Sequence, residues 1–232
     1  MTAFVALYKL FFRVTATRGR LAALGLLALG MVLLALTVRN DQQQAWGLFS
    51  LYALGGLVPI ASLVIASSTF GDLVDDLTLV HIWLRPVSRF AVVIGAWLSS
   101  VSLVLPFTVV VPGFAMFVAD LSVGAIGRLA FSALLGSLAY CAVFVALGLR
   151  LKRALAWGLA YILIWEGAVA NAGSGLARLA LRLSTRSIAF RAFPDETIRF
   201  PLSTATSIVV LASVTVAGLA FGVRWLRRAE VA

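Results

Sequence analysis

The sequence predicts an all-α fold: a polytopic integral membrane protein with six transmembrane helices. Of the 232 residues, 62% are hydrophobic and only 12% are charged, whereas soluble domains average about 25% charged residues. Apolar runs recur along the chain, and roughly 20 apolar residues are what an α-helix needs to cross a bilayer. The connections between the runs are too short for a folded soluble domain, so we predict one transmembrane domain over residues 1–232.

Six apolar runs define the expected spans. The third run is the longest and contains Pro106 and Pro112, so we expect it to kink or to bend along the outer interface. Gly218 and Gly222, in the last run, have the spacing of a close contact between membrane helices. The predicted spans are 21–38, 46–67, 90–119, 129–149, 154–172 and 202–223.

The basic residues predict orientation. The net charge is +10, but the arginines and lysines lie at the ends of apolar runs and form no dense stripe, so nucleic acid is not an expected partner. With a cytoplasmic N-terminus most of them fall inside, as the positive-inside rule requires; the arginines of loop 173–201 are the main exception. We predict a multi-pass protein with both termini cytoplasmic. The predominance of arginine over lysine, with abundant Ala, Leu, Val and Gly, favours a bacterial plasma (inner) membrane.

Residues 4–20 are amphipathic and predict a helix that lies along the membrane surface. The alternative is that its basic residues merely anchor the first span. The apolar face carries Phe4, Leu7, Phe11 and Val14, and the opposite face carries Lys9, Arg13, Thr17 and Arg20.

Two connections have helical patterns of their own. The inner connection predicts a helix over 70–84 with one apolar face and with acids at its start, where the helix dipole favours negative charge. Pro86 ends this helix, because proline cannot continue the hydrogen-bond ladder. The outer connection, 173–201, predicts a short amphipathic helix on the outer leaflet.

No catalytic, cofactor or metal site is expected in the chain. The phosphate-binding pattern G-x-x-x-x-G-K-S/T and the G-x-S-x-G elbow do not occur. His81 is the single histidine and Cys141 the single cysteine, too few to hold a metal ion within one chain. We therefore expect a protein that is not an enzyme by itself.

Glu166 is the one ionisable residue inside a predicted span, and Asn171 follows about one turn later. Burying a charge there costs roughly 2.5 to 3.5 kcal/mol on insertion scales, so such a residue faces protein or water. Two interpretations stay open. Glu166 and Asn171 could line a transport pathway, or Glu166 could lie near the outer end of its span, protonated or paired with an arginine of the next loop.

The inner connection carries a recognisable motif. Asp75-Asp76-Leu77-Thr78-Leu79, followed by Leu84-Arg85-Pro86-Val87-Ser88-Arg89, resembles the first cytoplasmic loop of ABC transporter permeases of the type 2 family. In that family an acidic pair, a small residue, Thr and Leu precede an Arg-Pro-x-Ser-Arg element that leads into the third span. This sequence departs from the pattern at Leu77, where Gly is usual, and has Asp where Glu is commoner.

The resemblance implies an elbow helix at 4–20, a coupling helix at 70–84, and partners. These are two copies of a cytoplasmic ABC ATPase, which would bind the ATP and magnesium, and a second copy of this permease or a close homologue. The implied ATPase-coupling residues are Asp72, Leu73, Asp75, Asp76, Leu77, Thr78, Val80, Leu84, Arg85, Pro86 and Arg89.

Export is the expected direction, because the E-A-A-x-x-x-G loop of common ABC importers is missing. The cargo implied by apolar spans is hydrophobic or amphipathic, such as a lipid, drug, peptide or glycan. One alternative is a proton-coupled carrier in which Glu166 titrates. Another is an accessory membrane subunit that transports nothing itself.

Overall fold

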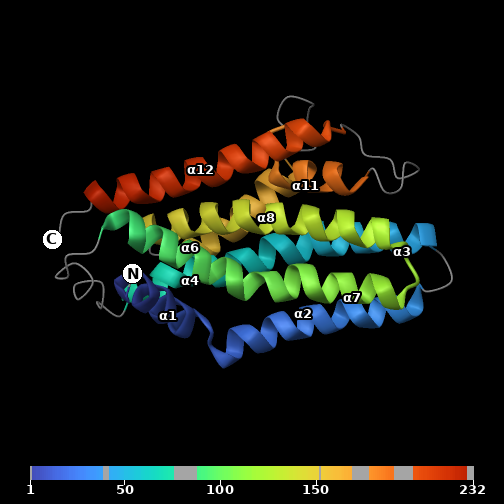
Figure 1. The fold of residues 1–232 in the computed structure, drawn as a ribbon, viewed down its shortest axis with the longest axis horizontal. Coiled ribbons are helices and arrows are strands. Elements are labelled where there is room, and N and C mark those ends of the chain that lie inside the picture. Colours follow the sequence, from blue (N-terminus) through green and yellow to red (C-terminus); the bar gives the residue numbers. More distant parts are fainter. Residues whose placement is uncertain are drawn as a thin grey trace.

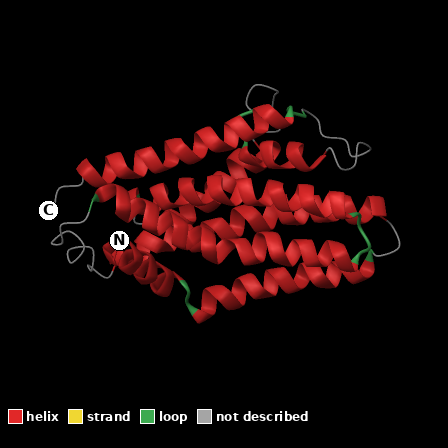
Figure 2. Cartoon of the chain, viewed as in Figure 1, coloured by secondary structure: helices red, strands yellow, loops and turns green. Residues whose placement is uncertain are grey.

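The computed structural model describes residues 2–38, 42–75, 88–151, 153–168, 178–190 and 201–228. Within these ranges the regular structure is entirely helical, with no strand (Figure 2), which confirms the predicted all-α class. The helices are α1 (Thr2–Thr15), α2 (Arg18–Thr37), α3 (Gln42–Phe49), α4 (Val58–Asp75), α6 (Arg89–Leu105), α7 (Val111–Val118), α8 (Val123–Arg150), α9 (Ala154–Ala160), α11 (Leu181–Phe190) and α12 (Thr204–Arg228), with π-helical segments η1 (Ser50–Leu57), η2 (Pro106–Val110) and η3 (Tyr161–Ala168).

Five stretches among the described residues are long and apolar enough to cross a membrane. They correspond to the first, second, third, fourth and last predicted spans. The fifth predicted span, 154–172, contains a shorter apolar helix, Ala154–Gly167, and 169–172 lie outside the described residues. A membrane-protein architecture is therefore shown with five candidate spans, and a sixth stays a prediction. The five are Arg18–Thr37, Gln44–Gly71, Arg89–Val118, Val123–Arg150 and Thr204–Arg228.

The third candidate span stays helical through both of its prolines. Its π-helical segment begins at Pro106, and the helix continues to Val118. A π-helical turn is one way for a helix to pass a residue that breaks its hydrogen-bond ladder. The expected disturbance at Pro106 thus takes the form of a widened turn.

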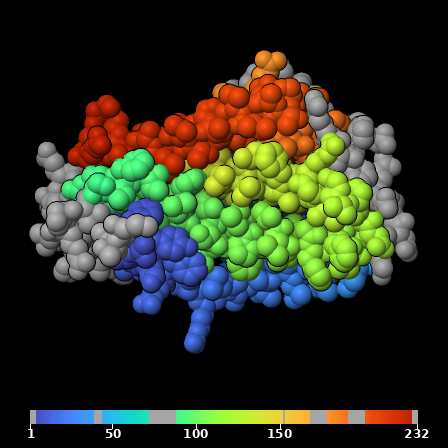
Figure 3. Space-filling view, viewed as in Figure 1, coloured from blue at the N-terminus to red at the C-terminus, as the bar shows by residue number. Residues whose placement is uncertain are grey.

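Helix α8 is the central element of the bundle. In its most apolar window 67% of the residues are buried, against 22% for α2 and 17% for α12, so those two helices are peripheral. Helices α4, α11 and α12 all pack on α8. In Figures 1 and 3, α12 and α2 form opposite edges of the molecule, with α6, α7 and α8 between them.

Glycines allow the closest approaches to α8. A Cβ at Gly148 would lie 2.7 Å from the backbone oxygen of Ser67 on α4. A Cβ at Gly218 would lie 3.0 Å from the carbonyl carbon of Ala142, and one at Gly222 would lie 3.3 Å from a Val93 methyl. Gly148 and Gly218 thus lie against the backbone of a neighbouring helix, whereas Gly222 lies against side chains of α6 and α8. Small residues allow such close approaches, which are common in membrane bundles.

Two alanine substitutions within α8 test this packing. Gly148→Ala should lower the unfolding temperature in detergent, because the new methyl group meets the Ser67 backbone and overpacking costs roughly 1 to 3 kcal/mol. Gly127→Ala is the matched control, since nothing lies within 4 Å of a Cβ there and alanine favours helix by about 1 kcal/mol. Equal unfolding temperatures for the two variants would contradict the close α4–α8 contact.

Candidate functional site

The amphipathic segment at the N-terminus forms helix α1, which packs on α6 and α4 at one end of the bundle (Figure 1). Leu7 and Phe11 are buried, whereas Lys9 and Arg13 are exposed, in agreement with the two predicted faces. The helix ends at Thr15. Arg18 and Arg20, expected at the end of this segment, belong to α2 instead, because the extended backbone of Thr17 separates the two helices.

A chain of three buried hydroxyl groups connects α1, α4 and α6. Thr15 Oγ1 lies 3.4 Å from Thr69 Oγ1, which lies 2.9 Å from Ser100 Oγ. Next to them the rings of Phe11 and Phe70 meet edge to face, with centroids 5.3 Å apart. We call Thr15, Thr69 and Ser100 the hydroxyl clasp. Hydrogen bonds of this kind hold helices together where no water competes for the hydroxyls.

Thr69 of the clasp lies about one helical turn before Asp72, the first of the predicted ATPase-coupling residues. Helix α4 runs to Asp75, so Asp72, Leu73 and Asp75 continue the second span as its last turn, where the sequence predicted a separate helix from residue 70. Arg89 opens α6, and Ser88 caps that helix by accepting a hydrogen bond from the Ala91 amide at 3.2 Å. The remaining coupling residues lie outside the described residues: Asp76, Leu77, Thr78, Val80, Leu84, Arg85 and Pro86.

The arrangement makes α1, the end of α4 and the start of α6 one packed unit. Residues 76–87, which connect the last two of these elements in the chain, lie outside the described residues. A force applied to this segment would act on two helices that α1 holds together.

The clasp can be tested by hydrogen exchange. Thr69→Val keeps the shape of the side chain and removes the hydroxyl that joins Thr15 to Ser100. We expect faster amide exchange in α1, since a lost buried hydrogen bond costs roughly 1 kcal/mol. Ser102→Ala on exposed α6 surface is the control, because that hydroxyl bonds only to Leu98 O of its own helix among the bonds described. Unchanged exchange in α1 would argue against the clasp.

Glu166 is buried and fully engaged in hydrogen bonds. It lies on η3 with 3% of its surface exposed. Its Oε1 accepts from the Tyr161 hydroxyl at 3.0 Å and from the Leu181 amide at 3.1 Å, and Oε2 accepts from the Arg182 amide at 2.9 Å. Three donors thus surround the carboxylate.

Two of these donors belong to the first residues of α11. The first amide groups of a helix have no partner within that helix, and the helix dipole favours a negative charge at this end. Glu166 therefore caps α11 from a different segment of the chain. The cap fixes a helix that packs on α8, α12 and η1 and buries residues from Leu181 to Ala189.

Tyr140 and Arg182 complete the surroundings of Glu166. Tyr140 is buried on α8, and its hydroxyl has no hydrogen-bond partner among the described residues. The Arg182 guanidinium packs against η1, where a Cβ at Gly55 would lie 2.9 Å from its Nη2. A substituent at Gly55 would displace this arginine.

Glu166 is held by hydrogen bonds at the start of α11, and one donor, the Arg182 amide, belongs to an arginine of the connection that follows its span. A part in a transport pathway stays a prediction. The described hydrogen-bond donors to Glu166 are two backbone amides and the Tyr161 hydroxyl, whereas the sequence suggested the side chain of an arginine. Asn171, the other predicted pathway residue, lies outside the described residues. Sequence reasoning missed Tyr161, although a signal exists: residues five apart lie on one face of a π-helix, and Tyr161 and Glu166 have this spacing.

Two substitutions separate the contributions to the cap. Glu166→Gln should destabilise the protein by roughly 1.5 to 3 kcal/mol, because hydrogen bonds to a charged acceptor are lost and an amide NH₂ can face the α11 amides. Tyr161→Phe should cost about 1 kcal/mol, since one donor is removed.

Thermal unfolding in detergent measures both effects, with Tyr8→Phe on α1 as the matched tyrosine control. A Glu166→Gln variant as stable as the wild type would show that the cap contributes nothing.

Neither a protein-family model nor a curated protein matches this chain. The function proposed below consequently rests on the sequence and the geometry.

Proposed function

We propose that this protein is the membrane permease subunit of an ATP-driven exporter that resembles the type 2 family of ABC transporters. The observation that carries the proposal is the docking of α1 on both α4 and α6. These helices flank segment 76–87, which contains most of the family-like motif. A helix that contacts both α4 and α6 can transmit motion from the coupling segment to the two spans beside it.

The proposed mechanism starts at the coupling segment, which includes residues 76–87. Two copies of a cytoplasmic ATPase bind ATP and magnesium and contact the coupling segment in each of two permease copies. Closure of the ATPases pushes on the packed unit of α1, α4 and α6. Because α4 also packs closely on α8, the push reaches the centre of the bundle and changes how the two copies meet.

The arginines at the helix ends support the proposed orientation, and the apolar spans support the proposed class of cargo. Arg150 and Arg228 end α8 and α12 at the same end of the molecule as α1, which supports a cytoplasmic position for that end and for both termini. Apolar spans suit a hydrophobic or amphipathic cargo. The use of Glu166 as a helix cap favours the permease over a proton-coupled carrier, in which this carboxylate would titrate.

The proposal is tested by purifying the tagged chain from its native membrane in mild detergent and labelling with a photoreactive ATP analogue. The chain has no phosphate-binding loop, so a labelled protein that co-purifies is a partner ATPase. Leu77→Asp and Leu84→Asp should reduce the labelled partner about tenfold or more. Burying a charge in an apolar interface costs at least the roughly 1.4 kcal/mol that corresponds to a tenfold loss of affinity.

Leu77→Met and Leu84→Met are the matched controls and should retain the partner, since they keep an apolar side chain of similar size. A folded wild type that yields no ATP-labelled partner would contradict the permease and favour a carrier or an accessory subunit.

A further inference from the structure

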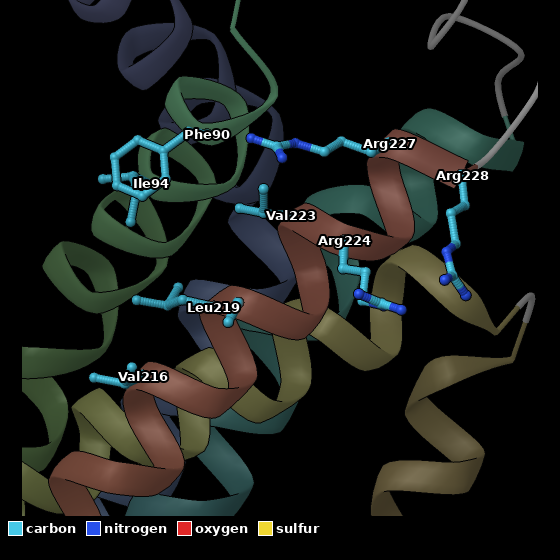
Figure 4. A pocket seen from close by; sticks show the side chains of 9 residues that line it. Phe90, Ile94, Val216, Leu219, Val223, Arg224, Arg227 and Arg228 are labelled. Atoms are coloured by element: carbon cyan, nitrogen blue, oxygen red, sulfur yellow. The ribbon is translucent and has the colours of Figure 1, made fainter.

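An open groove lies between the start of α6 and the end of α12 (Figure 4). Its volume is about 640 Å³. Phe90 and Val216 on opposite walls are 61% and 67% exposed, so the groove opens outward from the bundle. Its lining residues are Phe90, Ile94, Val216, Leu219, Ala220, Val223, Arg224, Arg227 and Arg228.

The groove is apolar along most of its length and basic at one end. Val216, Leu219 and Val223 form a continuous apolar wall on α12, because residues three and four apart share a helix face. Arg227 follows one turn further along this face. In Figure 4 its side chain extends toward Phe90, whereas Arg224 and Arg228 extend away from Phe90 on the other side of α12.

The electrostatics of the basic end favour an anion. Of the three lining arginines, Arg227 extends across the groove toward Phe90, and none of the nine lining residues is acidic. The start of α6 and the last turn of α12 lie together at this end of the groove, so the opposite ends of their helix dipoles largely offset each other. The attraction for a negative group therefore comes from the Arg227 guanidinium.

We infer that this groove binds an anionic phospholipid of the surrounding bilayer. The acyl chain lies along the apolar wall, and the phosphate lies beside Arg227. Both walls belong to candidate membrane spans, so the groove is within reach of lipid. Long basic side chains at the ends of membrane helices place their charge at the headgroup level while their stems stay in apolar surroundings.

Native mass spectrometry of the detergent-purified chain tests the inference, with phosphatidylglycerol or phosphatidylcholine added at equal concentration. The wild type should retain phosphatidylglycerol in preference. Arg227→Gln should weaken this retention about fivefold, the contribution of one basic residue near an anionic headgroup. Arg18→Gln, an exposed arginine at the start of α2, is the matched charge control and should leave retention unchanged.

A second variant tests the apolar part without removing charge. Ala220 is exposed, so Ala220→Trp should fold normally while filling the groove, and it should also weaken retention of phosphatidylglycerol. Inorganic phosphate at the same concentration should displace none of the bound lipid.

Three results would overturn the inference. Equal losses of phosphatidylglycerol retention in Arg227→Gln and Arg18→Gln would indicate that the lipid is held by the overall positive charge of the protein surface. Full displacement by phosphate, with Ala220→Trp binding like the wild type, would indicate an ion site. A changed oligomeric state in Ala220→Trp with unchanged lipid retention would indicate that a second copy of the chain fills the groove.

Discussion

Close approach of helix backbones to α8 is the constraint on which the rest of the bundle depends. Lipid is as apolar as a leucine side chain, so the hydrophobic effect does not drive membrane helices together, and packing has to do so. Glycines supply that packing where α4 and α12 meet α8. The hydroxyl of Ser132 on α8 donates to the Thr185 carbonyl of α11, which adds a polar contact at the same helix. Helices α1 and α2 reach this core indirectly, through their contacts with α4, α6 and α7.

The two polar clusters of the interior have different parts in the structure. The hydroxyl clasp joins three helices near the end that carries the coupling motif. The carboxylate of Glu166 lies in another part of the bundle and holds the start of α11. One cluster therefore joins long helices side by side, and the other fixes a short helix end-on. Both satisfy polar groups that would be costly to leave unpaired in apolar surroundings.

The length of an apolar run was sufficient to predict the helical class and most spans, because crossing a bilayer demands a similar run of apolar residues each time. The details that failed depend on contacts distant in sequence. The predicted boundary at residue 21 missed that α2 begins at Arg18, directly after the extended backbone of Thr17. The partners of Glu166 could not be predicted, because Leu181 and Arg182 reach it only through the path of the chain between them. The contact between Tyr161 and Glu166 was not predicted because α-helical spacing was assumed, in which residues three or four apart share a face. In a π-helical turn, residues five apart lie on one face.

The joint between α1 and α2 has a mechanical consequence. Helix α1 is attached to α4 and α6, while α2 packs on α7 and η1, where the Tyr52 hydroxyl donates to the Leu27 carbonyl at 2.9 Å. Only Ala16 and Thr17 separate the two helices. Hinges in proteins are often a few residues at the end of an element. A displacement of α1 would thus change the tilt of α2 about its contact with Tyr52 and alter how α2 packs on α7.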